Sequence, residues 1–137
     1  MRDRGAASMY VVLFAPSVLL LAGLLVDGGL AIHARQRAAD IAEQAARAGA
    51  NQIDEAALRR TGKPVLDPGR ARSAACAMVT EYDASARPLS CDADTGHVRV
   101  AVQLTVRSQI LGIVPGLGSF TMTSSATAQP VTGGEAP

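Results

Sequence analysis

The stretch that decides the fold runs from Gly5 to Val26 and reads GAASMYVVLFAPSVLLLAGLLV, 22 residues without one charged side chain. A helix rises about 1.5 Å per residue, so this stretch spans roughly 33 Å, close to the hydrocarbon thickness of a bilayer. It predicts a membrane-spanning helix over residues 6–27, after a tail of residues 1–5. Arg2 and Arg4 in that tail favour a cytoplasmic N-terminus and place the rest of the chain outside.

Two features leave this interpretation open to alternatives. Arg35 and Arg37 follow the apolar stretch closely, and they weaken the orientation because they also count as flanking charges. A cleaved secretory signal, cut after Ala34, is the competing interpretation. The apolar stretch exceeds the roughly 7–15 residues of a signal core, and Asp27-Gly28-Gly29 intervenes before that cut. A retained helix is therefore favoured over a signal.

Beyond Asp27 the chain becomes more polar but keeps a helical pattern. Small and aliphatic residues recur at three- and four-residue spacing from Leu30 to Arg60, with no proline between them. We expect one amphipathic helix over residues 28–60, with a stripe that includes Ala38, Ala42 and Ala45. Such a narrow alanine stripe suits packing against either the chain's own outer domain or a neighbouring helix.

The remainder predicts a small α+β domain over residues 61–130. Asp67 followed by Pro68 is typical of a helix start, and this helix should run to about Tyr82. Residues 87–94 are expected to be irregular or a short strand. Apolar and polar residues alternate over 97–107 and again over 119–129, which predicts two paired antiparallel strands. Residues 131–137 should form a flexible tail.

The two cysteines, Cys76 and Cys91, lie fifteen positions apart in the region expected outside. An even count in an exported domain, without the spacing of a metal or redox motif, favours one structural disulfide. Two unpaired small core residues are the alternative. Closing a loop of this size stabilises a domain by about 3 kcal/mol in the chain-entropy description.

The connection between the last two strands, SQILGIVPGLG, is unusually apolar for a loop. It either contacts a partner or a membrane surface, or it folds back over the sheet. The residues expected to make such a contact are Ile110, Leu111, Ile113, Val114 and Leu117.

Few residues suggest chemistry, and we expect neither enzymatic activity nor a metal or other cofactor. His33 and His97 are the only histidines, and no Cys or His cluster has zinc spacing. The segment from Asp92 to Gly96 is better explained as a turn than as a calcium loop. Thirteen basic against twelve acidic side chains give a net charge of +1, so nucleic acid is not an expected partner.

Asp27, Gly28 and Pro16 are the residues of the apolar stretch that we expect to matter for helix packing. Asp27 either marks the point where the helix meets water or pairs with a cation on a neighbouring subunit. Pro16 leaves the carbonyl four residues earlier without its helical donor, a cost that membrane helices tolerate.

These residues together resemble the N-terminal region of the TadE/TadG-like proteins of the tight-adherence (Tad, or Flp) pilus system. The match covers roughly residues 4–51: Arg4-Gly5 before the span, Pro16 within it, Val26-Asp27-Gly28 at its end, and the helix from Arg35 to Ala50. The resemblance implies a single-pass, pilin-like membrane protein. Its partners would be the lipid bilayer and other membrane-anchored pilin-like or pilus-assembly subunits.

One departure from that family concerns processing. TadE-like pseudopilins are cut after a glycine and carry a glutamate five residues beyond the cut, but a cut between Gly5 and Ala6 places Tyr10 there. We therefore expect an unprocessed, TadG-like anchor: a minor pilin-like or pilus-assembly protein of the cell membrane with an extracytoplasmic domain. The alternative is a secreted or surface-tethered binding module.

Overall fold

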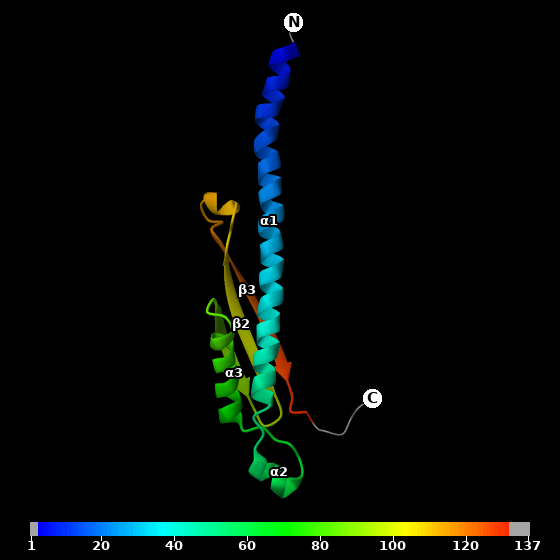
Figure 1. Cartoon of the computed structure of the whole chain (residues 1–137), viewed down its shortest axis with the longest axis vertical. Coiled ribbons are helices and arrows are strands. Elements are labelled where there is room, and N and C mark those ends of the chain that lie inside the picture. Colours follow the sequence, from blue (N-terminus) through cyan, green and yellow to red (C-terminus); the bar gives the residue numbers. More distant parts are fainter. Residues whose placement is uncertain (1–2, 132–137) are drawn as a thin grey trace, which may run out of the picture. The chain divides into compact units, whose positions relative to one another are not determined.

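The computed structural model describes residues 3–131, with side chains from Ala7 onward, and its elements follow one another in the order helices, then sheet (Figure 1). The α+β class is confirmed. The elements are α1 (Asp3–Ala50), α2 (Glu55–Thr61), α3 (Pro68–Tyr82), β1 (Ala86–Ala93), β2 (Val98–Arg107), the 3-10 turn η1 (Leu111–Ile113) and β3 (Ser119–Ala128).

Two compact units share these elements. The first combines α1 up to His33 with Val106–Phe120, and the second combines Ala34–Thr105 with the chain from Thr121 onward. Of the expected tails, residues 1–2 and 132–137 lie outside the described part of the chain, whereas residues 3–5 belong to α1. The proposed domain limits stay predictions.

The long helix α1 continues through Gly28 and Gly29 but ends at Ala50, so the prediction of one helix to Arg60 is wrong. Asp54 begins α2 instead, because its Oδ1 accepts the N–H of Ala57 at 3.0 Å and caps the new helix. Between the helices the backbone pairs with a distant segment, through an Ile53 to Leu66 bridge and a bond from the Asp54 N–H to the Val65 carbonyl at 2.8 Å. The Asp54 cap and this bridge therefore end α1 at Ala50, although the alanine spacing continues beyond it.

The second unit packs the alanine stripe of α1 into its own core. Ala38, Ala42 and Ala45 have no exposed surface, so of the two partners left open by the sequence the structure shows the chain's own domain. Gly49 permits the closest approach, since a Cβ there would lie 2.8 Å from the Ala71 carbonyl oxygen. The other core residues come chiefly from α3 and β2: Ala71, Ala75, Val79, Val98, Val100, Val102 and Leu104.

The sheet has the strand order β1-β2-β3 and is antiparallel, as the alternating patterns predicted for β2 and β3. Residues 86–93 form a full strand, longer than the irregular or short segment expected. The proline at position 88 argued against a strand in the sequence. The structure accommodates Pro88 because β1 is an edge strand and its register with β2 shifts between Pro88 and Ser90. The disulfide between Cys76 and Cys91 is confirmed, with its Cα atoms 5.9 Å apart, and it joins α3 to β1.

The turn between β1 and β2 is built on Asp94, as expected for a turn in place of a calcium loop. Its Oδ1 accepts the N–H of Gly96 and of His97, each at 2.7 Å. These two N–H groups, Gly96 first, lower the pKa of the Asp94 carboxyl below its ordinary value. Both hydrogen bonds stay within the turn, so the role of Asp94 in the structure is to stabilise the β1–β2 hairpin.

Candidate functional site: the Asp27 clasp

Asp27 is the most unusual residue of the first unit, because its side chain is an acid with only 1% of its surface exposed. The sequence left two interpretations of Asp27 open, and pairing with a cation on a neighbouring subunit stays a prediction. The carboxylate is shielded from solvent, and its partners in the structure are backbone amides of this chain.

Three consecutive N–H groups at the start of η1 converge on this carboxylate. The Gln109 N–H donates to Oδ1 at 2.9 Å, the Leu111 N–H donates to Oδ2 at 2.6 Å, and the Ile110 N–H lies within 3.4 Å of both oxygens. The first N–H groups of any helical turn have no partner inside the turn. A side chain from α1 therefore caps a turn that lies 82–84 residues further along the chain.

Gly23 allows the loop to come this close. It is buried one helical turn before Asp27, and a Cβ there would lie 2.9 Å from Ile110 Cγ2 and 3.7 Å from Leu111 Cδ2. We call Gly23, Asp27 and residues 109–111 the Asp27 clasp. Residues four apart lie on the same helix face, so the pattern Gly-x-x-x-Asp was the available signal. The sequence analysis missed it because the partner loop is remote.

The rest of the loop satisfies many of its own backbone groups. The Val114 N–H bonds to the Leu111 carbonyl and the Leu117 N–H to the Val114 carbonyl, while the Ser108 N–H bonds to the Gly118 carbonyl. The Ser108 hydroxyl also donates to the Leu117 carbonyl. The loop meets α1 at the clasp, and four of its apolar side chains stay partly or largely exposed: Ile110 41%, Ile113 87%, Val114 40% and Leu117 40%.

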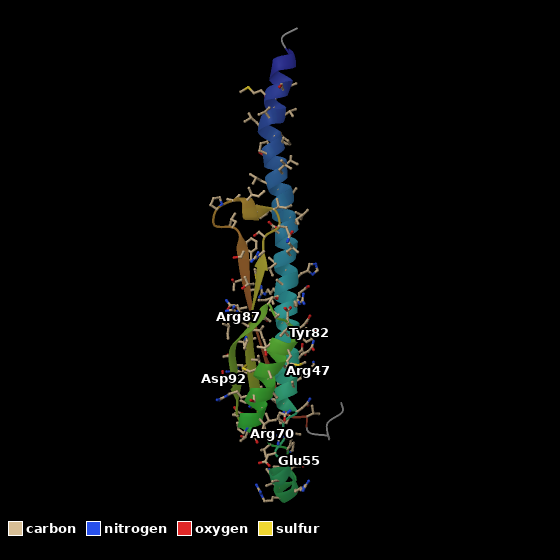
Figure 2. The ribbon with its side chains drawn as sticks, turned by 60° about the vertical axis from the view of Figure 1, so that its left-hand side comes forward. Arg47, Glu55, Arg70, Tyr82, Arg87 and Asp92 are labelled. Atoms are coloured by element: carbon tan, nitrogen blue, oxygen red, sulfur yellow. A yellow bond between two sulfur atoms is a disulfide. The ribbon has the colours of Figure 1, made fainter. Side chains whose placement is uncertain are left out.

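The N-terminal part of α1 presents large apolar side chains to its surroundings all around the helix (Figure 2). Its most apolar 18-residue window has a mean hydropathy of 2.4 and is 6% buried. By length and composition α1 is a candidate membrane-spanning helix. Pro16 lies inside it, exposed, next to a shallow hollow lined by Val11, Phe14, Ala15, Val18 and Leu19.

In the second unit, two polar contacts join α1 to the end of α3. Arg37 Nη2 lies 2.9 Å from Asp83 Oδ2, an ionic contact without a directed hydrogen bond, and Gln44 Nε2 donates to the Tyr82 hydroxyl at 3.4 Å. The hydroxyl and N–H of Ser85, and then the charge of Arg37, lower the pKa of the Asp83 carboxyl.

The structure thus separates the residues singled out in the sequence into three places. Asp27 joins Ile110 and Leu111 in the clasp, the three alanines lie in the core of the second unit, and the cysteines link α3 to β1. Gly28 has no atom within 4 Å of the position its Cβ would take. Its packing role and that of Pro16 stay predictions, and so does processing at Gly5 and Ala6.

Together these observations define a class: an α+β protein whose long N-terminal helix begins as a candidate membrane span and ends in the core of a small disulfide-linked unit. Residues 5–52, 48 of the 137 residues, match the family model for Flp pilus-assembly proteins of the TadE/G-like kind. The N-terminal region of the chain is thus similar to this family, as its resemblance over residues 4–51 predicted. No curated protein and no solved structure matches the chain.

Proposed function

We propose that this chain is a single-pass membrane protein that serves as a minor pilin-like or pilus-assembly subunit of a Tad pilus system. Its N-terminus is cytoplasmic, α1 crosses the membrane, and the disulfide-linked unit is presented outside. The proposed action is non-covalent, through packing of α1 with helices of other subunits and presentation of the outer unit. The proposal assigns the chain no catalytic role.

One observation carries this proposal: the family match ends where α1 ends. Residues 5–52 contain both the exposed apolar part of α1 and the part buried in the second unit, and the match stops just past Ala50. The matched region is therefore an anchor together with the stem that carries the outer unit. Subunits that pack together in a membrane would share such an anchor and stem, while their outer units could differ in sequence.

The charges and the disulfide support the orientation. Arg2 and Arg4 lie immediately before the span, whereas Arg35 and Arg37 lie eight and ten residues beyond Asp27. A disulfide between Cys76 and Cys91 persists in an oxidising compartment, which agrees with export of the second unit.

The first test concerns anchoring and orientation in the cells that make the protein. A version tagged at its C-terminus should stay with membranes after alkaline extraction, and external protease should remove the tag from intact spheroplasts. Leu20→Arg, at an exposed position of the span, should reduce membrane retention, whereas Leu89→Arg, at an exposed position of β1, should not. Recovery of a soluble form beginning near Arg35 would instead support the secreted module.

The second test concerns the pilus. Deleting the gene should reduce the number of surface pili, and the wild-type gene but not the Leu20→Arg variant should restore it. The intact mass of the membrane-extracted protein then distinguishes the two family roles. Full length supports an unprocessed TadG-like anchor, and loss of residues 1–5 supports a processed pilin-like subunit. Unchanged piliation after deletion would contradict the proposed role.

A further inference from the structure

The loop held by the Asp27 clasp has no function in the account above. It carries four partly or largely exposed apolar side chains, and no residue from Ser108 to Gly118 is charged. Resting on the proposed membrane anchoring, we propose that this loop is a second membrane contact, which inserts the side chains of Ile110, Ile113, Val114 and Leu117 into the outer leaflet beside α1.

The depth of the loop follows from its contact with α1 inside the first unit. Ile110 meets Gly23, four residues toward the N-terminus from Asp27, which is about 6 Å by helical rise. Asp27 closes the uncharged stretch and so marks the boundary of the hydrocarbon. Amphipathic segments that lie in the interface bury their apolar faces by about 5–10 Å, and the Gly23 contact lies within that range.

The hydrogen bonds of the loop also suit a lipid environment. Irregular backbone is tolerated at membrane depth only where its polar groups are satisfied by protein. Here the N–H groups of residues 109–111 bond to Asp27, and those of Ser108, Val114 and Leu117 bond to carbonyls within the loop. The Asp27 carboxylate is in turn shielded, with 1% of its surface exposed.

Lipid is the occupant that these observations favour over a second copy of the chain. The exposed side chains of the loop continue the apolar surface of α1, whose residues up to Val26 are themselves exposed. A surface continuous with a membrane span requires the same solvent as the span. The shared surface would make α1 and the loop one anchoring unit, tied together by Asp27.

The chain contains no tryptophan, so a single introduced tryptophan reports one position. The full-length protein, in phosphatidylethanolamine and phosphatidylglycerol vesicles, would carry Ile113→Trp in the loop, Phe14→Trp in the span or Leu89→Trp in β1. All three positions are exposed, so the substitutions leave the packing intact. Quenching is measured with nitroxide lipids labelled at a shallow or a deep acyl carbon, and with aqueous acrylamide.

We expect shallow nitroxide to quench the Ile113→Trp reporter and acrylamide to have little effect on it. Deep nitroxide should quench the Phe14→Trp reporter, and only acrylamide should quench the one at position 89. Acrylamide quenching at position 113 equal to that at 89 would overturn the proposal. Protection from both lipid and acrylamide would overturn it too, in favour of a protein partner. If the Phe14→Trp reporter is not quenched by lipid, the anchoring itself fails.

Tryptophan favours membrane interfaces on its own, so a second variant separates this preference from the clasp. Asp27→Asn replaces one carboxylate oxygen with an NH2 group that faces the donor amides of the loop. In the Ile113→Trp background it should expose the reporter to acrylamide, while the Phe14→Trp reporter stays quenched by lipid. An unchanged depth at position 113 would show that Asp27 does not position the loop.

Discussion

The two parts of α1 both carry apolar side chains, but these side chains differ in size and direction. From Ala7 to Val26 the large side chains point outward and are mostly more than half exposed, as in Leu25 at 79%, whereas from Ala34 to Ala50 the inward residues are nearly all alanine and buried. Large exposed side chains suit a surrounding of lipid. Small buried ones let other backbones approach. Within one helix, residue size therefore distinguishes an anchor from a stem.

The strongest test of this contrast places the same charge at a buried and at an exposed position of α1. Ile41→Asp should lower the free energy of unfolding of the second unit by about 4 kcal/mol or more, because Ile41 is fully buried and a carboxylate there loses its hydration. Ile32→Asp is the matched control, at a position 63% exposed. Pulse proteolysis in urea measures both. Equal effects would contradict the burial of Ile41 in the second unit.

Removing the disulfide should lower the stability of the second unit without affecting the proposed anchor. Cys76→Ser with Cys91→Ser should lower the stability of the second unit by about 3 kcal/mol, since the bond closes a loop of fifteen residues between α3 and β1. Membrane retention by α1 should not change. Reduction of the wild-type protein should reproduce the loss and leave the double variant unaffected, and a wild type indifferent to reductant would contradict this prediction.

Two glycines of α1 should respond oppositely to alanine. Gly49→Ala places its Cβ 2.8 Å from the rigid Ala71 carbonyl oxygen, and overpacking of about 1–3 kcal/mol should exceed the gain of roughly 1 kcal/mol in helix propensity. We expect a net loss of about 1 kcal/mol in urea unfolding. Gly28→Ala meets nothing within 4 Å and should cause no loss. A stabilised Gly49→Ala variant would show that α1 does not approach α3 so closely.

The smallest expected effect is on pH dependence. The pKa of Asp83 is lowered in the folded protein from an ordinary value of 3.8, chiefly by Ser85. Its contribution to stability is therefore present above that value and is lost as the pH falls through the lower folded pKa. Asp83→Asn should reduce the loss of unfolding free energy as the pH falls below about 4. Glu55→Gln, in an exposed pair with Arg59, is the control and should leave this loss unchanged. An identical loss for Asp83→Asn and the wild type would refute this.

Local patterns predicted most of the fold, because helix starts, strand alternation and the long apolar stretch are written in neighbouring residues. Asp67 with Pro68 located α3, and the alternating valines located β2. The break after Ala50 was missed, because Asp54 acts as a cap only when the chain turns to pair Ile53 with Leu66. Sequence periodicity contains no information about such a remote pairing.

The candidate site was predicted in pieces. Asp27 and the apolar loop were each singled out, but nothing in their composition indicates that one binds the other. Their pairing depends on the connection between β2 and β3, which brings the loop to α1. It also depends on Gly23, because a side chain there would collide with Ile110, and the sequence analysis did not single this glycine out. The residue types indicated Asp27 and the loop separately, and the three-dimensional structure was needed to show that one binds the other.

The Asp27 clasp also has a consequence for the order of events during synthesis. Its carboxylate leaves the ribosome 82 residues before the first of its partner amides, the N–H of Gln109. At synthesis rates of about 5–20 residues per second, that interval is on the order of 4–16 s. During this time the acid at the end of the apolar stretch is charged and without its later partners, which opposes its passage into the hydrocarbon. Under the proposed anchoring, Asp27 would therefore hold the end of α1 at the membrane boundary before the loop exists, and afterwards the same side chain holds the loop.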